Sequence, residues 1–508
     1  MPKRYLEKIL KARVYDVAIE TPMEIMPRLS ERTGNTIWLK REDLQPVFSF
    51  KLRGAYNKMS QLSDSERQNG VIAASAGNHA QGVALAAQRL GISAIIVMPK
   101  TAPAIKVNAV RSRGSKVILH GDTYDEACSH AIKLSEEKAM CFIHPYDDPE
   151  VIAGQGTIAA EILNRQTQIP DIIFVPVGGG GLLAGIAAYC KSLYPNIKII
   201  GVEHEDAPSM YQAFKHKRRV KLDRVGIFAD GAAVRQAGKE PFRIARLCVD
   251  DIILVTTDEI CAAIKDIFDD TRSIAEPAGA LATAGVKKYI SNAELSNCQL
   301  VSICSGANIN FDRLRHVAER ADVGEHREAL LAVTIPERPG SFLKFCRLLG
   351  KRSITEFNYR YADQKTAHIF VGVELTQGES QKNSLIELLN NKKYPVMDMT
   401  DNEMAKLHVR YMVGGHSVTG TDESVYRFEF PERPGALLQF LGCIGQRWNI
   451  SLFHYRNHGA AYGRVLVGIQ INKEDKSDLA GFFDSLGYKY WEETDNPAYK
   501  LYLSTQNH

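Results

Sequence analysis

Short apolar runs alternate with amphipathic stretches over about the first 320 residues. Six runs predict buried strands, at 70–75, 93–99, 115–120, 171–177, 198–203 and 299–304. Between them, apolar residues recur every three or four positions, the spacing of helices with one buried face. This alternation is typical of parallel sheets covered by helices on both faces, where ligands bind at the carboxyl ends of strands. We therefore predict an α/β domain at 1–324, with a smaller lobe built from about residues 50 to 150.

A different pattern follows and occurs twice. Val333–Gly340 (VTIPERPG) returns as Phe428–Gly435 (FEFPERPG), 95 residues later. Glu356–Arg360 then matches Leu452–Arg456 at a shift of 96, so one residue is inserted in the second copy. Self-similarity over this range predicts two related modules, whose effector pockets need not be equivalent.

The elements of each module are predicted in one order. In the first copy, strands are expected at 330–335, 354–361, 368–375 and 394–399, with helices at 341–349 and 384–390. The order strand, helix, strand, strand, helix, strand is that of α+β ferredoxin-like modules. We place these modules at 329–401 and 423–495.

The composition of the chain mainly argues against some classes of partner. The 508 residues are 45% hydrophobic, which is enough for several cores, and the net charge of +4 is dispersed. The sequence contains no basic block with interleaved aromatics, no secretory signal pattern and no apolar run of membrane-spanning length, so nucleic-acid and membrane partners are not expected. Nine cysteines without a C-x-x-C pair are interpreted as reduced thiols. We expect a cytoplasmic, multidomain protein.

The segment Ser49–Ala55 places a lysine at the start of a predicted helix. A strand is predicted at 37–43, and Ser49 is predicted to cap the helix that carries Lys51 in its first turn. The apolar positions of this helix share one face: Leu52, Ala55, Met59 and Leu62. The positive end of the helix dipole disfavours an ammonium, which helps to supply the neutral amine that attacks an aldehyde. Lys51 is therefore a candidate Schiff-base residue.

Three further turns follow predicted strands. The small residues of Ser75–Gly77 leave backbone amides uncovered at a helix start, which suits a carboxylate, and Asn78 adds a side-chain donor. Four consecutive glycines, Gly178–Gly181, allow several N–H groups to converge on a phosphate. Ser305 follows the last strand and is a candidate hydrogen-bond partner for a ring nitrogen.

Together these segments resemble the fold-type II pyridoxal-phosphate enzymes, whose two-lobed catalytic domain is similar to that of the tryptophan synthase β chain. The resemblance implies that Lys51 binds the cofactor covalently, Phe50 packs against its ring, Asn78 bonds its 3-hydroxyl and Ser305 faces its pyridine nitrogen. The phosphate would be held by Gly178, Gly179, Gly180, Gly181 and Leu182. The substrate would be bound by Ser75, Ala76, Gly77, Asn78 and His79. No metal site is expected.

Within that family, Ser49–Ala55 and Ser305–Asn308 are most similar to the threonine dehydratases, or threonine ammonia-lyases. This resemblance implies β-elimination of water from L-threonine, giving 2-oxobutanoate and ammonia in the committed step of isoleucine biosynthesis. A serine at position 305, rather than an aspartate, leaves the ring nitrogen largely unprotonated and favours elimination over transamination.

The two C-terminal modules resemble the ACT-like regulatory pair of the biosynthetic threonine dehydratases. The resemblance implies feedback inhibition by isoleucine, antagonism by valine, and a homotetramer. The Pro-Gly turn of each module opens a helix whose free amides suit an amino acid's carboxylate. The expected effector residues are Gly340, Phe342, Gly435 and Leu437.

Several alternatives stay open at this point. A related enzyme could act on serine as a dehydratase or racemase, a non-catalytic sensor could keep the fold, and the paired modules could serve oligomerisation alone. Gly179–Ala184 also satisfies a G-x-G-x-x-A dinucleotide fingerprint, with Glu203 as the ribose-binding acid. That interpretation leaves Lys51 and Ser305 without a role. Glu203–Asp206 is interpreted as a solvated strand end, and Ala233 stands where a larger residue is expected.

Overall fold

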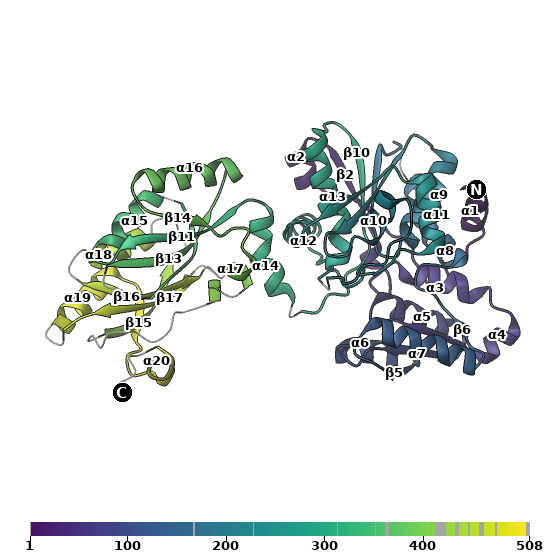
Figure 1. Ribbon diagram of the computed structural model, residues 1–508, viewed down its shortest axis with the longest axis horizontal. Helices are drawn as coiled ribbons and strands as arrows, with labels where there is room; N and C mark the ends of the chain where they lie inside the picture. The colour runs from purple at the N-terminus through teal and green to yellow at the C-terminus, as the bar shows by residue number, and fades with distance from the viewer. Residues whose placement is uncertain are drawn as a thin grey trace. The chain divides into compact units, whose positions relative to one another are not determined.

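The computed structural model divides into two compact units, Met1–Gly324 and Glu325–His508 (Figure 1). It describes the whole chain except residues 1, 166–167, 227, 312, 351, 361–364, 408, 412–422, 432–435, 445–447, 457–461, 473–474 and 504–508. No helix within the described part of the chain has the length and apolar character needed to cross a membrane.

The larger lobe of the first unit is built on a six-stranded sheet of order β1-β2-β10-β7-β8-β9. Its strands are β1 (Met23–Ile25), β2 (Thr36–Arg41), β7 (Ile172–Pro176), β8 (Lys198–His204), β9 (Asp251–Val255) and β10 (Gln299–Cys304). All neighbours are parallel except β1 and β2. The carboxyl ends of the five parallel strands therefore share one edge of the sheet.

Helices cover both faces of this sheet, because neighbouring strand residues face opposite sides. On one face, Ile173 and Val175 pack with α1 (Pro2–Leu10), α8 (Pro149–Arg165) and α9 (Gly181–Leu193). Also on this face are α10 (Ser209–His216) and α11 (Lys239–Cys248). On the other face, Ile172 and Phe174 pack with α2 (Pro27–Thr33), α12 (Thr257–Thr271), α13 (Pro277–Ala293) and α14 (Arg313–Gly324).

The smaller lobe has a four-stranded parallel sheet of order β5-β4-β3-β6. Its strands are β3 (Val71–Ala74), β4 (Ala94–Met98), β5 (Lys116–Leu119) and β6 (Cys141–Phe142). Its helices are α3 (Lys51–Ser60), α4 (Asp64–Asn69), α5 (Asn78–Leu90), α6 (Ala104–Arg111) and α7 (Tyr124–Glu137). The predicted α/β fold, with two parallel-sheet lobes, is confirmed.

The second unit is a single eight-stranded sheet of order β14-β11-β13-β12-β16-β17-β15-β18. The first module contributes β11 (Glu328–Pro336), α15 (Ser341–Leu349), β12 (Ile354–Arg360), β13 (Thr366–Glu374), α16 (Gly378–Asn391) and β14 (Val396–Asp398). Between the modules lie α17 (Glu403–Leu407) and a short 3-10 helix at Val409–Tyr411. The second module contributes β15 (Glu423–Pro431), α18 (Ala436–Ile444), β16 (Asn449–Arg456), β17 (Tyr462–Gln470), α19 (Lys476–Leu486) and β18 (Lys489–Glu492), followed by α20 (Pro497–Tyr502).

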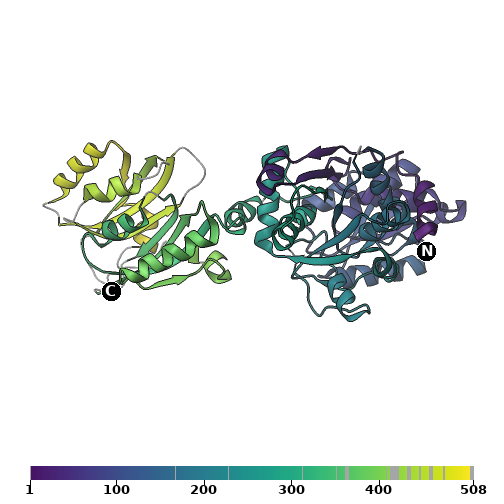
Figure 2. The ribbon, with the colours of Figure 1, turned by 90° about the horizontal axis from the view of Figure 1, so that it is seen from above.

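The two modules join through their edge strands β12 and β16, so the yellow strands of the second continue the green sheet of the first (Figure 1; Figure 2). In this antiparallel pair Asn358 lies opposite His454, which is also its equivalent in the repeat. A residue paired with its own repeat equivalent marks an approximate twofold axis. Each half keeps the predicted ferredoxin-like order, and both halves contribute to one hydrophobic core.

Candidate active site

Lys51 is the first residue of α3, as the sequence predicts. The predicted apolar face is buried: Leu52, Ala55 and Met59 are fully covered, and Leu62 nearly so. The Lys51 Nζ donates to the Pro145 carbonyl at 3.3 Å and lies 5.2 Å from the centroid of the Phe50 ring. Burial lowers the pKa of the Lys51 ammonium to about 8, and the nearby Glu276 carboxylate partly opposes this shift. A useful fraction of neutral amine is therefore present near neutral pH.

The segment before Lys51 is held by the turn after β10. The Phe50 N–H donates to the Ser305 carbonyl at 3.2 Å, and Ser49 forms an isolated bridge with Gly306. Ser305, buried like Phe50, donates its hydroxyl to the Ala278 carbonyl at 3.3 Å. A hydroxyl rotates to suit its partners, so this long contact leaves Ser305 Oγ available to a ring nitrogen.

The local expectation for Ser49 is wrong. Phe50, not Ser49, stands at the N-cap of α3, and the buried Ser49 Oγ has no hydrogen-bond partner among the described residues. The bridge to Gly306 fixes the Ser49 backbone and carries the side chain away from the free amides of the helix. The strand predicted at 37–43 also ends earlier, at Arg41, because Glu42–Leu44 form a short 3-10 helix.

Asn78 begins α5 and is almost fully buried. Its Nδ2 donates to Glu276 Oε1 at 2.5 Å, and its Oδ1 accepts from Asn308 Nδ2 at 2.7 Å. The Asn308 amide also donates to the Val47 carbonyl at 2.8 Å, close to the start of α3. These contacts bring the predicted Asn78 and Lys51 segments to one place, together with Glu276.

The glycine turn Gly178–Gly181 joins β7 to α9. Gly180 is the N-cap with φ 93°, and no side chain caps this helix, so its first amides are available to an anion. A Cβ on Gly179 would lie 2.2 Å from the Tyr146 ring. Tyr146 follows Pro145, the carbonyl that accepts from Lys51, so this segment links the glycine turn to the lysine.

The turn Ser75–Gly77 joins β3 to α5. Gly77 is the N-cap, without a side-chain cap bond, and a Cβ placed on it would meet no atom within 4 Å. His79 is the second residue of α5, and its Nε2 contacts the Ile143 carbonyl at 2.8 Å. Burial and the Lys51 charge lower the pKa of His79 to about 3, so its ring is neutral. The open space at this turn borders backbone amides rather than the His79 ring.

These donors fit one kind of cofactor. The site offers a lysine amine of lowered pKa, an uncapped glycine-rich helix start, a buried amide at Asn78 and a buried hydroxyl at Ser305. An aldehyde, a phosphate, a ring hydroxyl and a ring nitrogen are their natural partners. Pyridoxal phosphate carries all four groups.

Two contributors were not identified from the sequence. Glu276 stands 198 residues from Asn78, and the segment Ile143–Tyr146 follows a strand of only two residues. The only local signal for Glu276 is the proline after it, which marks a helix start at α13. Nothing near it in sequence indicates its partner.

Glu203 is not the solvated strand end that the sequence predicts. It is fully buried, and its carboxylate accepts from the backbone N–H groups of Met210 at 2.9 Å and Tyr211 at 2.7 Å. Burial raises its pKa to about 8, against the effect of these bonds. Because both oxygens of the Glu203 carboxylate accept from backbone N–H groups of α10, Glu203 is not available to bind a ribose. The dinucleotide interpretation therefore loses its ribose-binding acid. The described residues contain no cluster of three or more potential metal ligands.

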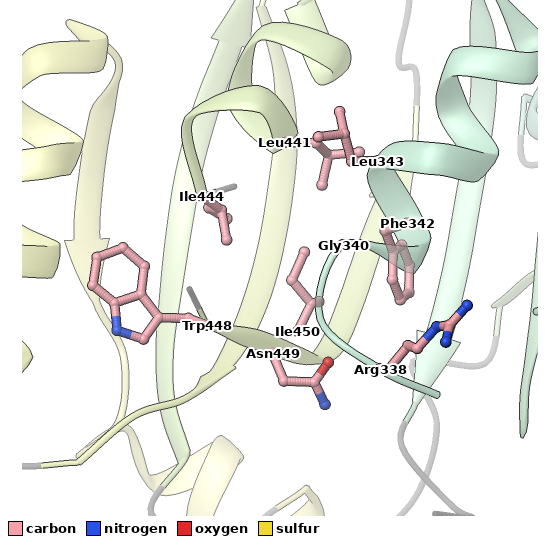
Figure 3. A pocket seen from close by; sticks show the side chains of 9 residues that line it. All are labelled: Arg338, Gly340, Phe342, Leu343, Leu441, Ile444, Trp448, Asn449 and Ile450. Atoms are coloured by element: carbon pink, nitrogen blue, oxygen red, sulfur yellow. The ribbon is translucent and has the colours of Figure 1, made fainter. Parts of the chain in front are cut away.

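A pocket lies within the C-terminal unit, between its two modules (Figure 3). It is small and partly open to solvent, with a cavity volume of about 10 Å³, room for about one water molecule. Its lining residues are Arg338, Gly340, Phe342, Leu343, Leu441, Ile444, Trp448, Asn449 and Ile450. Arg338 and Asn449 lie at one end, and Leu343 and Leu441 at the other (Figure 3). The pocket therefore presents a polar end and an apolar end to a small molecule.

Two family models match the chain. The model for pyridoxal-phosphate dependent enzymes matches residues 14–306. The model for the C-terminal regulatory domain of threonine dehydratase matches twice, at 319–409 and 414–503.

Curated relatives match almost end to end. The biosynthetic L-threonine dehydratase IlvA of Pasteurella multocida is 55% identical over 98% of this chain and 97% of that protein. The Escherichia coli IlvA is 53% identical, with the same coverage. The mitochondrial threonine dehydratase of Saccharomyces cerevisiae is 50% identical over 98% of this chain and 89% of its own.

Solved structures match the first unit. The processed form of threonine deaminase isoform 2 from Solanum lycopersicum has a TM-score of 0.62 and 52% identity, covering 63% of this chain and 93% of that one. Serine racemase from Dictyostelium discoideum has a TM-score of 0.56 and 33% identity, covering 60% and 99%.

Proposed function

This chain belongs to the biosynthetic threonine dehydratases, and from that premise we propose that it converts L-threonine to 2-oxobutanoate and ammonia. It is a pyridoxal-phosphate dependent threonine ammonia-lyase. The observation that carries the chemistry is the partly buried Lys51, whose pKa is lowered to about 8 beside the donors that fit the cofactor. The predicted function, enzyme class and cofactor are confirmed at this level by the family matches.

The residue roles are our proposal. Lys51 holds the aldehyde carbon of pyridoxal phosphate, Gly178–Leu182 hold its phosphate, Phe50 packs against its ring, and Asn78 and Ser305 bond the ring's oxygen and nitrogen. The bound cofactor supplies an electron-withdrawing group that eases loss of the Cα proton and of the β-hydroxyl. The uncapped start of α9 and the burial of Asn78 and Ser305 support this assignment.

The chain itself supplies positioning and proton transfer. The Ser75 N–H already donates to the Val97 carbonyl at 3.1 Å, and the Gly77 N–H donates to Ser75 Oγ at 3.2 Å. Within the segment Ser75–His79, the backbone N–H groups of Ala76, Asn78 and His79 therefore bind the threonine carboxylate in the open space beside Gly77. The substrate's amino group would first displace Lys51 from the aldehyde carbon, which frees the Lys51 amine. Lys51 Nζ then takes the proton from Cα, because an amine with pKa near 8 both accepts and returns a proton close to neutral pH.

Serine is the competing substrate, and a serine-directed dehydratase or racemase is the second candidate. A single methyl group discriminates by about 1–3 kcal/mol, so the site geometry alone does not separate them. The two regulatory-domain matches favour threonine, because the matched model describes the C-terminal regulatory domain of threonine dehydratase. The test is to measure 2-oxobutanoate from threonine and pyruvate from serine with one preparation. A kcat/KM in favour of serine would overturn the assignment.

The pocket of Figure 3 is our candidate effector site for isoleucine. Its apolar end, with Leu343, Leu441 and Ile444, suits a branched aliphatic side chain, while Arg338 suits a carboxylate. Valine has a shorter side chain of the same class and would compete for the same space. Isoleucine then inhibits and valine opposes the inhibition.

The predicted effector residues fall into three groups. Gly340 and Phe342 line this pocket. Leu437 packs against the shared core of the modules and is not among the lining residues. Gly435 lies outside the described residues. We therefore propose one effector site that uses both modules, at 329–401 and 423–495. Gly340 and Phe342 belong to the side of this site that the first module contributes.

We also propose a cytoplasmic homotetramer. The regulatory-domain matches support a regulated enzyme, and within the described residues the pair of modules supplies a long sheet whose edge strands, β14 and β18, could pair with another copy of the chain. Light scattering after size exclusion gives the mass directly. Four times the 56.5 kDa chain is expected, and a mass that stays at one chain at micromolar concentration would contradict the tetramer.

A further inference from the structure

Glu276 is a buried acid that does not cap its own helix. It occupies the N-cap position of α13, and its side chain accepts no bond from the first helical amides. Its carboxylate accepts from Asn78 Nδ2, at the start of α5, at 2.5 Å. A Cβ on Gly306 would lie 2.5 Å from Glu276 Oε1, so the glycine leaves the space that the carboxylate occupies. The position of this carboxylate is therefore explained by its bond to Asn78 and not by helix capping.

The bonds to Asn78 define which way its amide points. A side-chain amide has a donor end and an acceptor end of nearly equal size, and either end can face a given neighbour. Here the ionised carboxylate of Glu276 only accepts, and the Asn308 Nδ2 only donates. Glu276 therefore selects the Nδ2 end of Asn78, and Asn308 selects the Oδ1 end. One N–H of Asn78 Nδ2 is left over for a further acceptor.

We propose that Glu276 is a positioning residue, which fixes the Asn78 amide so that its remaining N–H serves the ring oxygen of the cofactor. This inference rests on the proposed function of Asn78. It assigns Glu276 no contact with substrate or cofactor. The carboxylate acts through Asn78, with Asn308 as its counterpart on the other end of the same amide.

The groups around Glu276 hold the pKa of its carboxyl near neutrality, so that the ionised form is available to accept from Asn78. Burial and the Asp230 carboxylate raise its pKa, the Asn78 bond, Lys106 and Lys51 lower it, and the net pKa is about 7. Lys106 and Asp230 form an ion pair at 2.9 Å. The carboxylate form prevails above about pH 7, where it holds Asn78 through a charge-assisted bond. Below that pH this bond weakens.

A double-mutant cycle on cofactor binding tests the proposal. The apoproteins of wild type, Glu276→Ala, Asn78→Ala and the double variant are titrated with pyridoxal phosphate, and Kd and the visible absorbance maximum are recorded. Each single variant should weaken binding about tenfold, the size of one hydrogen bond to a charged or buried group. The double variant should bind as Asn78→Ala does, within about twofold, because Glu276 acts only through Asn78. Effects that multiply would overturn the proposal.

Two further variants keep the test decisive. Glu276→Gln retains an acceptor for Asn78 and should recover most of the affinity, with an absorbance maximum closer to wild type than that of Glu276→Ala. Asn308→Ala removes the opposite contact and should shift the absorbance in the same direction as Glu276→Ala. If Glu276→Ala fails to fold, Asn308→Ala carries the cycle with Asn78→Ala. Wild-type protein that binds no pyridoxal phosphate would instead contradict the proposed function itself.

Discussion

Arg53 donates to Glu161 from two nitrogens, Nη1 at 2.5 Å and Nη2 at 3.0 Å, and both side chains are buried. The same guanidinium also donates to Glu42, and Lys40 Nζ donates to Glu161 at 2.5 Å. Two cations and two carboxylates thus form one neutral buried cluster. Arg53 stands two residues after Lys51, so the cluster ties the first turn of α3 to α8 and to the turn after β2.

Removing one charge from this cluster should be costly. Glu161→Gln leaves Arg53 and Lys40 with one carboxylate between them, and breaking a buried pair typically costs about 3–5 kcal/mol. The midpoint of thermal inactivation should fall clearly. Glu7→Gln, which breaks the exposed pair with Lys11, is the matched control and should change stability by less than about 1 kcal/mol. Equal effects of the two variants would contradict the role of the cluster.

The lowered pKa of Lys51 predicts the pH dependence of cofactor attachment. The neutral amine is the reactive form, so the rate of attachment to apoprotein should rise with pH and level off above about pH 8. The rise reflects deprotonation of Lys51, whose ordinary pKa is 10.5. Stopped-flow absorbance with excess pyridoxal phosphate gives this profile. A rate that keeps rising to about pH 10 would show an unperturbed lysine.

Gly77→Ala should weaken threonine binding without disturbing the fold. The new Cβ meets no protein atom within 4 Å, so it does not clash with the fold. The backbone pair φ −130°, ψ −138° lies outside the regions that alanine prefers, so the turn should shift slightly, and thermal stability is measured together with KM. If the threonine carboxylate docks at this turn, the methyl group occupies its space, and KM should rise about tenfold or more while cofactor content stays normal. Gly481→Ala in α19, where a Cβ also meets nothing, is the control and should leave KM unchanged. An unchanged KM in Gly77→Ala would place the substrate elsewhere.

Arg338→Met should reduce isoleucine inhibition while sparing catalysis. A hydrogen-bonded ion pair with a carboxylate is worth about 1.5–3 kcal/mol, so the isoleucine concentration for half inhibition should rise at least about tenfold. Arg347→Met on the same helix α15, outside the pocket, is the control. The kcat/KM for threonine without isoleucine should be unchanged in both. Normal isoleucine sensitivity in Arg338→Met would exclude this pocket as the effector site.

The parts of the site that could be predicted from sequence are those with local signals. Buried strands and the glycine turns that end them are recognisable within a few residues, and they place Ser75–Gly77, Gly178–Gly181 and Ser305 at strand ends. The apolar periodicity after Ser49 also places Lys51 at the start of a helix. The repeat likewise predicts both ferredoxin-like modules. Because β7 and β10 are parallel neighbours in one sheet, topology alone brings Gly178–Gly181 and Ser305 together, whereas Ser75–Gly77 ends a strand of the other sheet.

The parts that could not be predicted depend on residues distant in sequence. Glu276 meets Asn78 across 198 positions, and Glu203 turns inward because the start of α10 closes over it. Serine is a common N-cap residue, but the backbone of Ser49 forms a bridge with Gly306, and Phe50 takes the N-cap position instead. In each case a polar residue is satisfied by a partner that only the tertiary fold supplies.

The central claim is that Lys51 carries the deamination of threonine. The most direct test measures 2-oxobutanoate formation from L-threonine by wild type and Lys51→Ala, each purified with excess pyridoxal phosphate. Wild type should turn over, and Lys51→Ala should lose about 10²–10⁴-fold or more in kcat, as expected when the acid–base group is removed. Borohydride reduction should attach the cofactor to the Lys51 peptide only in wild type. A Lys51→Ala enzyme with the normal rate would contradict the account.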